Sequence, residues 1–236
     1  MINIPGNLDA IYNRIDEALL NTDRCVKDII LVAASKGQSS EAIRIAYASG
    51  QRHFGENYLQ EALKKQQELH DLSDICWHFI GPMQSNKAKK IALNFDWVHT
   101  IDKIKNAERL GRSREDKQSP LNVCIQVNIS EEESKSGLST RECPQTAAEI
   151  ANFSSLKLRG LMAIPENNAT EEGKKKACRA LSKLFFEVKN SSPRLATLDT
   201  LSMGMSSDFE IALKEGATII RVGSAIFGPR QLLQQT

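Results

Sequence analysis

The chain has 236 residues, a length that suits one large α/β domain, and its 31 basic and 29 acidic side chains leave a formal net charge of +2. So balanced a charge gives no electrostatic drive toward nucleic acid or anionic membranes. The first 20 residues lack the apolar core of a signal peptide and the length of a membrane span. We therefore expect a cytoplasmic protein with no nucleic-acid partner and no membrane partner.

The five cysteines, Cys25, Cys76, Cys124, Cys143 and Cys178, are odd in number and widely scattered. They form no C-x-x-C pair of the kind that holds zinc or works as a redox couple. Their pattern is typical of reduced cytosolic thiols, and we expect no metal site.

The first predicted element is an amphipathic helix that ends near Asn21. Its apolar positions fall on one face at helical spacing. These positions are Leu8, Ile11, Ile15, Ala18 and Leu19.

A unit of one strand followed by one helix then repeats along the chain. Residues 28–36, DIILVAASK, are a β-branched run, and residues 39–50 change to helical periodicity, with serines that can cap the helix and Gly50 at its end. The seven further strand-like segments are residues 52–57, 75–82, 97–102, 120–130, 156–164, 197–204 and 218–223.

Eight such units indicate a single (β/α)8 TIM-like barrel with an additional N-terminal helix, and we expect residues 1–236 to form one domain. Several segments are nearly continuous apolar runs, which is typical of parallel strands covered on both faces. An open doubly wound sheet with edge strands is the alternative.

Lys36 ends the first strand-like segment, and the C-terminal ends of barrel strands form the mouth where active sites lie. Its stem would lie among apolar residues, which favours the neutral amine that condenses with an aldehyde. The alternative is a lysine at a strand end that extends into water.

The segments that end the last two strands have the residue types of a phosphate site. Ser202 and Ser224 offer hydroxyl donors, Gly223 lets backbone amides approach an anion, and Arg221 adds a charge. In TIM barrels the loops after strands seven and eight commonly bind phosphate. Glycine and serine can also simply make tight turns.

Seven strings, in order along the chain, resemble the pyridoxal-phosphate homeostasis protein family, whose members have an alanine-racemase-type barrel. The resemblance runs from about Ile29 to Arg230. The strings are VAASK, GQRHFGENYLQEA, WHFIGPMQSNK, CIQVNISEEESKSG, LRGLMAIP, LSMGMSSDFEIAL and RVGSAIFG.

The resemblance implies that Lys36 holds pyridoxal 5′-phosphate as a Schiff base. It implies phosphate contacts for Ser202, Gly223 and Ser224, and it matches Arg221 with the arginine that faces the pyridine nitrogen in racemase-like barrels.

By the same resemblance Asn57, His78 and Met203 line the cofactor, and Lys135 matches a lysine near the barrel mouth. Taken without it, Asn57 could cap a helix, His78 and Met203 could be core residues, and Lys135 could be a solvated charge.

One departure from the family pattern concerns the loop that follows the Schiff-base lysine. Family members often have Thr-Lys-Pro there, whereas this chain has Gly37-Gln38-Ser39. The lysine is kept, but the stiffness and charge of the loop differ.

An arginine can only donate to the pyridine nitrogen, so that nitrogen stays unprotonated and the ring is a weak electron sink. Racemases of this type also use a tyrosine from a second domain, and we expect no such domain because the sequence ends soon after the eighth strand. Only Tyr58, one of three tyrosines in predicted helices, is near the mouth.

We therefore predict a monomeric carrier without catalytic residues, which acts in intracellular vitamin B6 homeostasis and has pyridoxal-phosphate-dependent apoenzymes as recipients. The first alternative is a racemase or transaminase that uses His78 or Tyr58 as a second proton-transfer group. The second is a barrel for another phosphorylated metabolite, with Lys36 as an electrostatic clamp.

Overall fold

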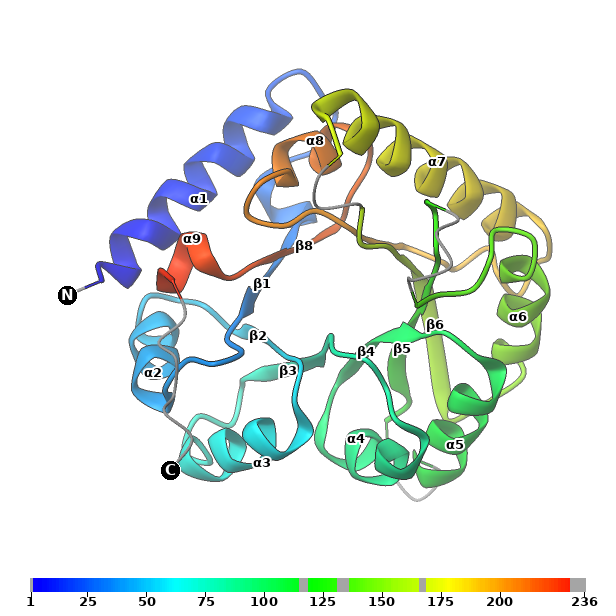
Figure 1. The fold of residues 1–236 in the computed structure, drawn as a ribbon, viewed down its shortest axis with the longest axis horizontal. Coiled ribbons are helices and arrows are strands. Elements are labelled where there is room, and N and C mark those ends of the chain that lie inside the picture. The colour runs from blue at the N-terminus through cyan, green and yellow to red at the C-terminus, as the bar shows by residue number, and fades with distance from the viewer. Residues whose placement is uncertain (1, 115–118, 131–135, 166–168, 230–236) are drawn as a thin grey trace.

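The computed structural model describes residues 2–114, 119–130, 136–165 and 169–229. Eight parallel strands form a closed barrel in the order in which they occur in the chain, and the helices surround it (Figure 1). The prediction of a (β/α)8 barrel is confirmed, and closure rules out the open doubly wound sheet. The strands are β1 (Ile30–Ala34), β2 (His53–Glu56), β3 (Cys76–Phe79), β4 (Trp97–Ile101), β5 (Leu121–Gln126), β6 (Leu156–Met162), β7 (Thr200–Ser202) and β8 (Ile219–Val222).

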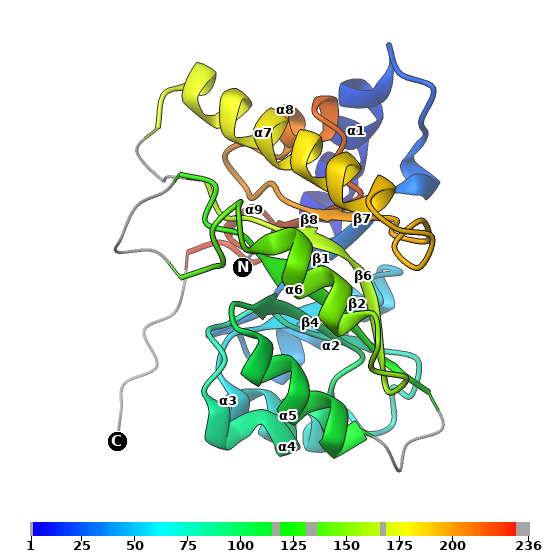
Figure 2. The same cartoon turned by 90° about the vertical axis from the view of Figure 1, so that its right-hand side faces the viewer.

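The helices pack around the barrel, with α7 the longest of them (Figure 2). They are α1 (Ile4–Leu19), α2 (Ser40–Ala48), α3 (Leu59–Glu68), α4 (Ala88–Asn94), α5 (Ile104–Arg114), α6 (Cys143–Ile150), α7 (Glu171–Asn190), α8 (Phe209–Lys214) and the short α9 (Ser224–Phe227), with 3₁₀ turns η1 (Val26–Asp28) and η2 (Ser85–Lys87). None of the helices in these described ranges has both the length and the apolar character that crossing a membrane requires.

Helix α1 starts earlier than the apolar periodicity alone predicts. Pro5 lies in its first turn, where its missing N–H is not needed, and the Asn3 side chain accepts a hydrogen bond from the Gly6 amide at 3.1 Å. The helix packs against α8 and α9 near the other end of the chain. The Asn7 side chain donates to the Ile226 carbonyl oxygen at 2.8 Å, which ties α1 to α9.

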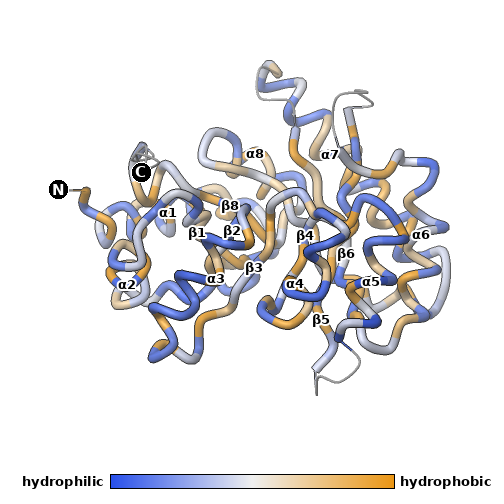
Figure 3. Tube along the Cα trace, turned by 60° about the horizontal axis from the view of Figure 1, so that its bottom comes forward, coloured by the Kyte–Doolittle hydropathy of each residue, from blue (hydrophilic) through white to orange (hydrophobic). Residues whose placement is uncertain are grey.

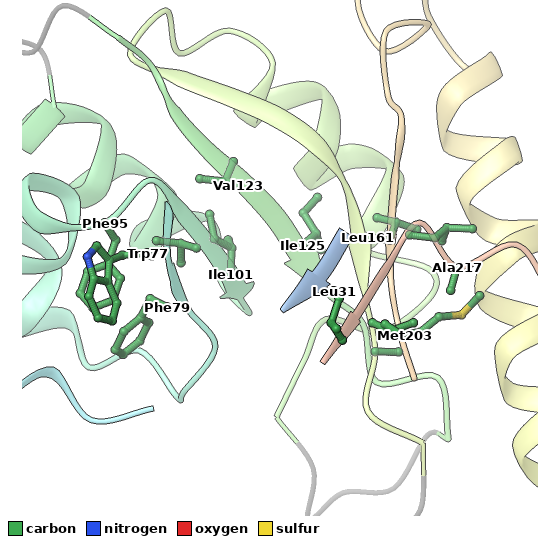
Figure 4. Close-up of a cluster of buried hydrophobic side chains, with 14 of the residues drawn as sticks. Leu31, Trp77, Phe79, Phe95, Ile101, Val123, Ile125, Leu161, Met203 and Ala217 are labelled. Atoms are coloured by element: carbon green, nitrogen blue, oxygen red, sulfur yellow. The ribbon is translucent and has the colours of Figure 1, made fainter. Parts of the chain in front are cut away.

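Apolar side chains fall into two clusters because successive residues of a strand point to opposite faces. The larger cluster lies between strands and helices; Figure 4 shows part of it, with Leu31, Val123 and Leu161. Along the helices hydrophobic residues alternate with hydrophilic ones, as an inner and an outer face require (Figure 3). The smaller cluster faces the barrel interior and consists of Val32, Trp97, Cys124, Met162 and Ile219.

The barrel closes through pairing between the first and the last strand. Val32 pairs with Arg221, and Ala33 pairs with Val222. The residues that follow β1 therefore lie beside those that follow β8, although almost the whole chain separates them.

Strands β6 and β7 approach so closely at Gly160 that a side chain has no room there. A Cβ atom at this position would lie 1.8 Å from the Thr200 carbonyl oxygen. We expect Gly160→Ala to lower the free energy of unfolding by about 1–3 kcal/mol, because the strands must shift apart. Urea denaturation measures it. Gly173→Ala in α7 is the matched control and should leave stability unchanged or slightly higher; equal stability of the two variants would contradict the packing argument.

Candidate functional site

A cavity of about 290 Å³ lies at the C-terminal ends of β1, β7 and β8. It brings together four of the residues predicted from the sequence, namely Lys36, Arg221, Gly223 and Ser224. None of the described residues that line it is acidic. The full lining is Ala34, Lys36, Gln38, Met205, Ser206, Ser207, Arg221, Gly223, Ser224 and Gly228.

The backbone on both sides of Lys36 is held by a buried lysine of α3. The Lys65 ammonium group donates to the Ser35 carbonyl oxygen at 2.7 Å and to one oxygen of Glu61 at 2.6 Å. The same Glu61 oxygen accepts from the Gly37 amide at 2.6 Å. Lys36 thus lies between two anchored residues in the turn that follows β1, which fixes where its side chain starts.

The centre of this network is the carboxyl group of Glu56, at the end of β2. It accepts from the Lys65 ammonium group at 2.7 Å and from the Ser35 hydroxyl at 2.6 Å. Burial raises the pKa of Glu56, and the charge of Lys65 offsets part of that rise. Ion pairing inside the protein therefore supports the loop that carries Lys36.

The loop that departs from the family pattern is locally well formed. Gly37 has a φ of 72°, a left-handed conformation that glycine adopts without strain. Ser39 caps α2, because its hydroxyl accepts from the Ala42 amide at 3.2 Å. Gln38, between them, lines the cavity.

The Arg221 guanidinium is buried inside the barrel beneath the cavity. It donates to the Ser202 hydroxyl at 2.7 Å and to the Ala163 carbonyl oxygen at 3.0 Å. Burial lowers the pKa of Arg221 to about 10, so the group stays protonated at neutral pH. At this position it can donate hydrogen bonds but cannot accept one.

Ser202 lies inside the barrel and does not line the cavity. Its hydroxyl oxygen lies 2.8 Å from Nδ1 of His99 and accepts from Arg221, so its phosphate contact stays a prediction. The cavity is lined instead by the hydroxyls of Ser206 and Ser207, which the sequence analysis missed although they come just after Ser202. The Ser224 hydroxyl donates to that of Ser206 at 3.3 Å.

Three histidines continue the line from Ser202 through the barrel interior. Nε2 of His99 lies 2.9 Å from Nδ1 of His78, and Nε2 of His78 lies 2.9 Å from Nδ1 of His53. Burial lowers the pKa of His78 well below its usual value, that of His99 to about 3, and that of His53. The rings are therefore neutral, and in each contact between two ring nitrogens one nitrogen donates its N–H group to the other.

His78 and Met203, two predicted cofactor-lining residues, are fully buried. They line neither the cavity of Lys36 nor the second cavity at the barrel mouth, which is described next. The His78 ring stacks on that of Trp97 with centroids 5.4 Å apart, and Met203 belongs to the apolar layer under the helices. Direct contact of either residue with a cofactor stays a prediction. Lys135 lies outside the described residues.

A second cavity, of about 330 Å³, lies at the ends of β2 to β6. Asn57 lines it, and within the described ranges its buried side-chain oxygen has no hydrogen-bond partner, so it remains available as an acceptor. Asn57 does not cap α3, whose N-cap is Tyr58. Thr100 and Gln126 also line this cavity, and the sequence analysis missed both.

The histidines predict a loss of stability in mild acid. Burial lowers the pKa of His99 in the folded protein to about 3, below its usual 6.5. Between pH 6.5 and about pH 3 the His99 ring therefore takes up a proton only in the unfolded chain. The free energy of unfolding should therefore fall as the pH drops below 6.5. In His99→Gln the slope between about pH 6 and 5 should decrease by about 1 kcal/mol per pH unit.

Urea denaturation at several pH values measures this slope. His70→Gln, which removes an exposed histidine outside the line of rings, is the control and should keep the wild-type slope. If His99→Gln also kept it, the assignment of this proton to His99 would be wrong.

The sequence matches the family described as alanine racemase, N-terminal domain, over residues 6–231. A curated relative from Pseudomonas aeruginosa, named pyridoxal phosphate homeostasis protein, is 47% identical over 230 residues, which cover 98% of this chain and 97% of the relative. A protein of the same name from Escherichia coli K12 is 43% identical over 232 residues, 98% of each chain.

Among solved structures, PipY of Synechococcus elongatus PCC7942 without PLP is similar, with a TM-score of 0.87, 37% identity and coverage of 96% of this chain and 100% of PipY. A second PipY structure, described as having PLP bound, has a TM-score of 0.85 and 36% identity over the same shares of the two chains.

The structure of an alanine racemase from Corynebacterium glutamicum is 16% identical, with a TM-score of 0.66. The alignment covers 97% of this chain and 63% of the racemase, and this similarity shows the fold alone. The barrel, the matched family and the identity over nearly the whole length of the curated relatives agree, and this chain belongs to the pyridoxal phosphate homeostasis protein family.

Proposed function

We propose that this protein binds pyridoxal 5′-phosphate at the barrel mouth, holds it as a Schiff base on Lys36 and takes part in intracellular vitamin B6 homeostasis. The observation that carries the proposal is that Lys36 and Arg221 line one cavity together with Gly223 and Ser224. The names of the relatives and the PLP-bound structure of PipY support it.

The cavity suits an anionic aldehyde. Its lining contributes two basic side chains, Lys36 and Arg221, and the hydroxyls of Ser206, Ser207 and Ser224, with no acidic group among the described lining residues. Charge-assisted and hydroxyl hydrogen bonds are the usual means of holding a phosphate. The side-chain oxygen of Asn57, which has no hydrogen-bond partner among the residues that the structure describes, offers an acceptor at the neighbouring cavity. The residues present therefore fit the cofactor.

In this proposal the phosphate lies between the loops after β7 and β8, within reach of Ser206 and Ser224. Gly223 leaves little room for a side chain, because a Cβ atom there would lie 3.0 Å from the Ala34 carbonyl oxygen, beside the loop of Lys36. Ser202 would act indirectly by holding Arg221, since its hydroxyl accepts from that guanidinium group. Arg221, which lines the cavity, would be the residue that donates to the pyridine nitrogen.

The same residues support binding without substantial turnover. Pyridoxal phosphate supplies an electron sink, which deepens when an acidic partner keeps its ring nitrogen protonated. Arg221 is charged and can only donate, so it cannot fill that role. Among the described residues that line the two cavities at the mouth, Lys36 and Arg221 are the only titratable ones.

Racemisation needs a second proton-transfer group near Lys36, and the candidates from the sequence do not supply it. The side chain of Tyr58 is exposed and lines neither cavity, and His78 is buried inside the barrel. We therefore favour a carrier that releases the cofactor to pyridoxal-phosphate-dependent apoenzymes. The carrier is proposed to be a cytoplasmic monomer, and its five free cysteines fit a reducing compartment.

Lys36→Ala tests the proposed covalent bond. Wild-type protein mixed with pyridoxal 5′-phosphate should show the visible absorption of the Schiff base, and borohydride should fix the cofactor on the peptide that contains Lys36. The variant should show neither, because the amine is gone. Lys103→Ala, which removes an exposed lysine before α5, is the control and should behave as wild type. A band that survives in Lys36→Ala would overturn the assignment.

Exchange of amino-acid α-protons in deuterated water tests the carrier against the racemase. We expect the loaded protein to exchange the α-protons of alanine and other small amino acids within roughly tenfold of free cofactor. A second positioned acid–base group would add about 10²- to 10⁴-fold. Mass spectrometry measures deuterium uptake, an alanine racemase serves as the positive control, and turnover in that higher range would establish an enzyme.

A further inference from the structure

A cluster of nitrogen and sulfur donors lies at the end of the barrel opposite to Lys36. His53 is the first residue of β2 and Cys76 the first of β3, and the two are direct register partners. His78, two residues further along β3, points to the same face as Cys76. His53 and Cys76 are partly exposed, whereas His78 is buried.

The three donor atoms lie close enough to share one ion. Nδ1 of His53 is 2.9 Å from Nε2 of His78, Sγ of Cys76 is 3.4 Å from the same nitrogen, and all three atoms lie within 4.8 Å of one another. A tetrahedral zinc ion binds nitrogen at about 2.0–2.1 Å and sulfur at about 2.3 Å, so its ligands lie about 3.4–3.6 Å apart. The sulfur–nitrogen pair matches this spacing, and the two imidazoles must open by about 0.5 Å.

We propose that His53, Cys76 and His78 form a binding site for Zn²⁺ at the N-terminal end of the barrel. Two imidazoles and a thiolate are a donor set that this borderline cation prefers. The position of His53 and Cys76 at the first residues of their strands lets the side chains adjust and gives the ion access from outside. The site lies apart from the mouth and does not depend on the proposed function.

The two imidazoles are in the protonation state that a metal ligand needs, whereas the thiol of Cys76 must lose its proton. Burial lowers the pKa values of His53 and His78, which keeps their rings neutral and able to ligate. Burial raises the pKa of Cys76 to about 12, so the cation must replace the thiol proton, which passes to solvent. The negative charge of Asp96 acts on both His53 and Cys76 and favours a cation there.

The line of histidines supplies the support that a ligating imidazole needs. With the ion on Nε2 of His78, its Nδ1–H group donates to Nε2 of His99, 2.9 Å away. The Nδ1–H group of His99 then donates to the Ser202 hydroxyl oxygen, which also accepts from Arg221. Such a partner behind a ligating histidine fixes its tautomer. The contacts of Nε2 of His78 with His53 and Cys76 are exchanged for the ion.

Two basic side chains near the site are each paired with a carboxylate. Arg52, next to His53 in the chain, pairs with Asp74 at 2.6 Å. The Arg159 guanidinium lies 4.7 Å from the Trp97 ring centroid and pairs with Asp199 at 2.7 Å. The carboxylate of Asp199 thus neutralises the positive charge of Arg159.

Titration of the chelator-treated, reduced full-length protein with Co²⁺, a spectroscopic stand-in for Zn²⁺, tests the site. We expect one equivalent to give the sulfur-to-cobalt charge-transfer band together with the d–d bands of low coordination number, and Zn²⁺ to displace them. Cys76→Ser should remove the charge-transfer band. His53→Gln should weaken Zn²⁺ binding, measured by competition with a chromophoric chelator, by at least tenfold.

Two matched variants keep the result specific. Cys25→Ser and His70→Gln each remove an exposed side chain of the same type and should bind as wild type. Circular dichroism verifies that each variant is folded, and since Cys76 and His53 are replaced separately, either one alone decides the test. No stoichiometric complex in the wild type, or a charge-transfer band that persists in Cys76→Ser or disappears in Cys25→Ser, would overturn the proposal.

Discussion

The pairing of β1 with β8 is the constraint on which the candidate site depends. It closes the barrel and brings Lys36 beside Gly223 and Ser224, which lie at opposite ends of the sequence. Without this ladder the two groups of residues would be at the two edges of an open sheet. The proposed Schiff-base lysine and the proposed phosphate-binding loop can therefore meet at one small molecule only because the strands close into a ring.

The interior of this barrel differs from the usual layers of branched apolar side chains. Polar contacts extend from Arg221 through Ser202 and His99 toward His53, and every hydrogen-bond distance along them is 2.7–2.9 Å. Buried polar groups cost stability unless each is satisfied, so such a line fixes side-chain orientation as one unit. The orientation of Arg221 at the mouth thus depends on residues at the far end of the barrel.

The sequence was sufficient to predict the eight strands and the gathering of Lys36, Arg221, Gly223 and Ser224, because parallel strands of a barrel expose their C-terminal ends at one mouth. It was not sufficient for the inward direction of Ser202 or for the burial of Lys65 against Glu56, since both depend on partners that register and packing select. His53 and Cys76 are likewise neighbours only through strand pairing, and no local motif marks them.

The contact of α1 with α8 and α9 has a consequence for the order of events during synthesis. A chain leaves the ribosome from its N-terminus. Helix α1 therefore emerges long before α8 and α9, which cover it, and Lys36 emerges long before Gly223 and Ser224, which line the same cavity. The nascent chain therefore exposes the part of α1 that packs on α8 and α9 until these two helices have been synthesised. A ligand that contacts both Lys36 and the residues after β8 can bind only after β8 has been synthesised, so its abundance cannot assist the early stages of folding.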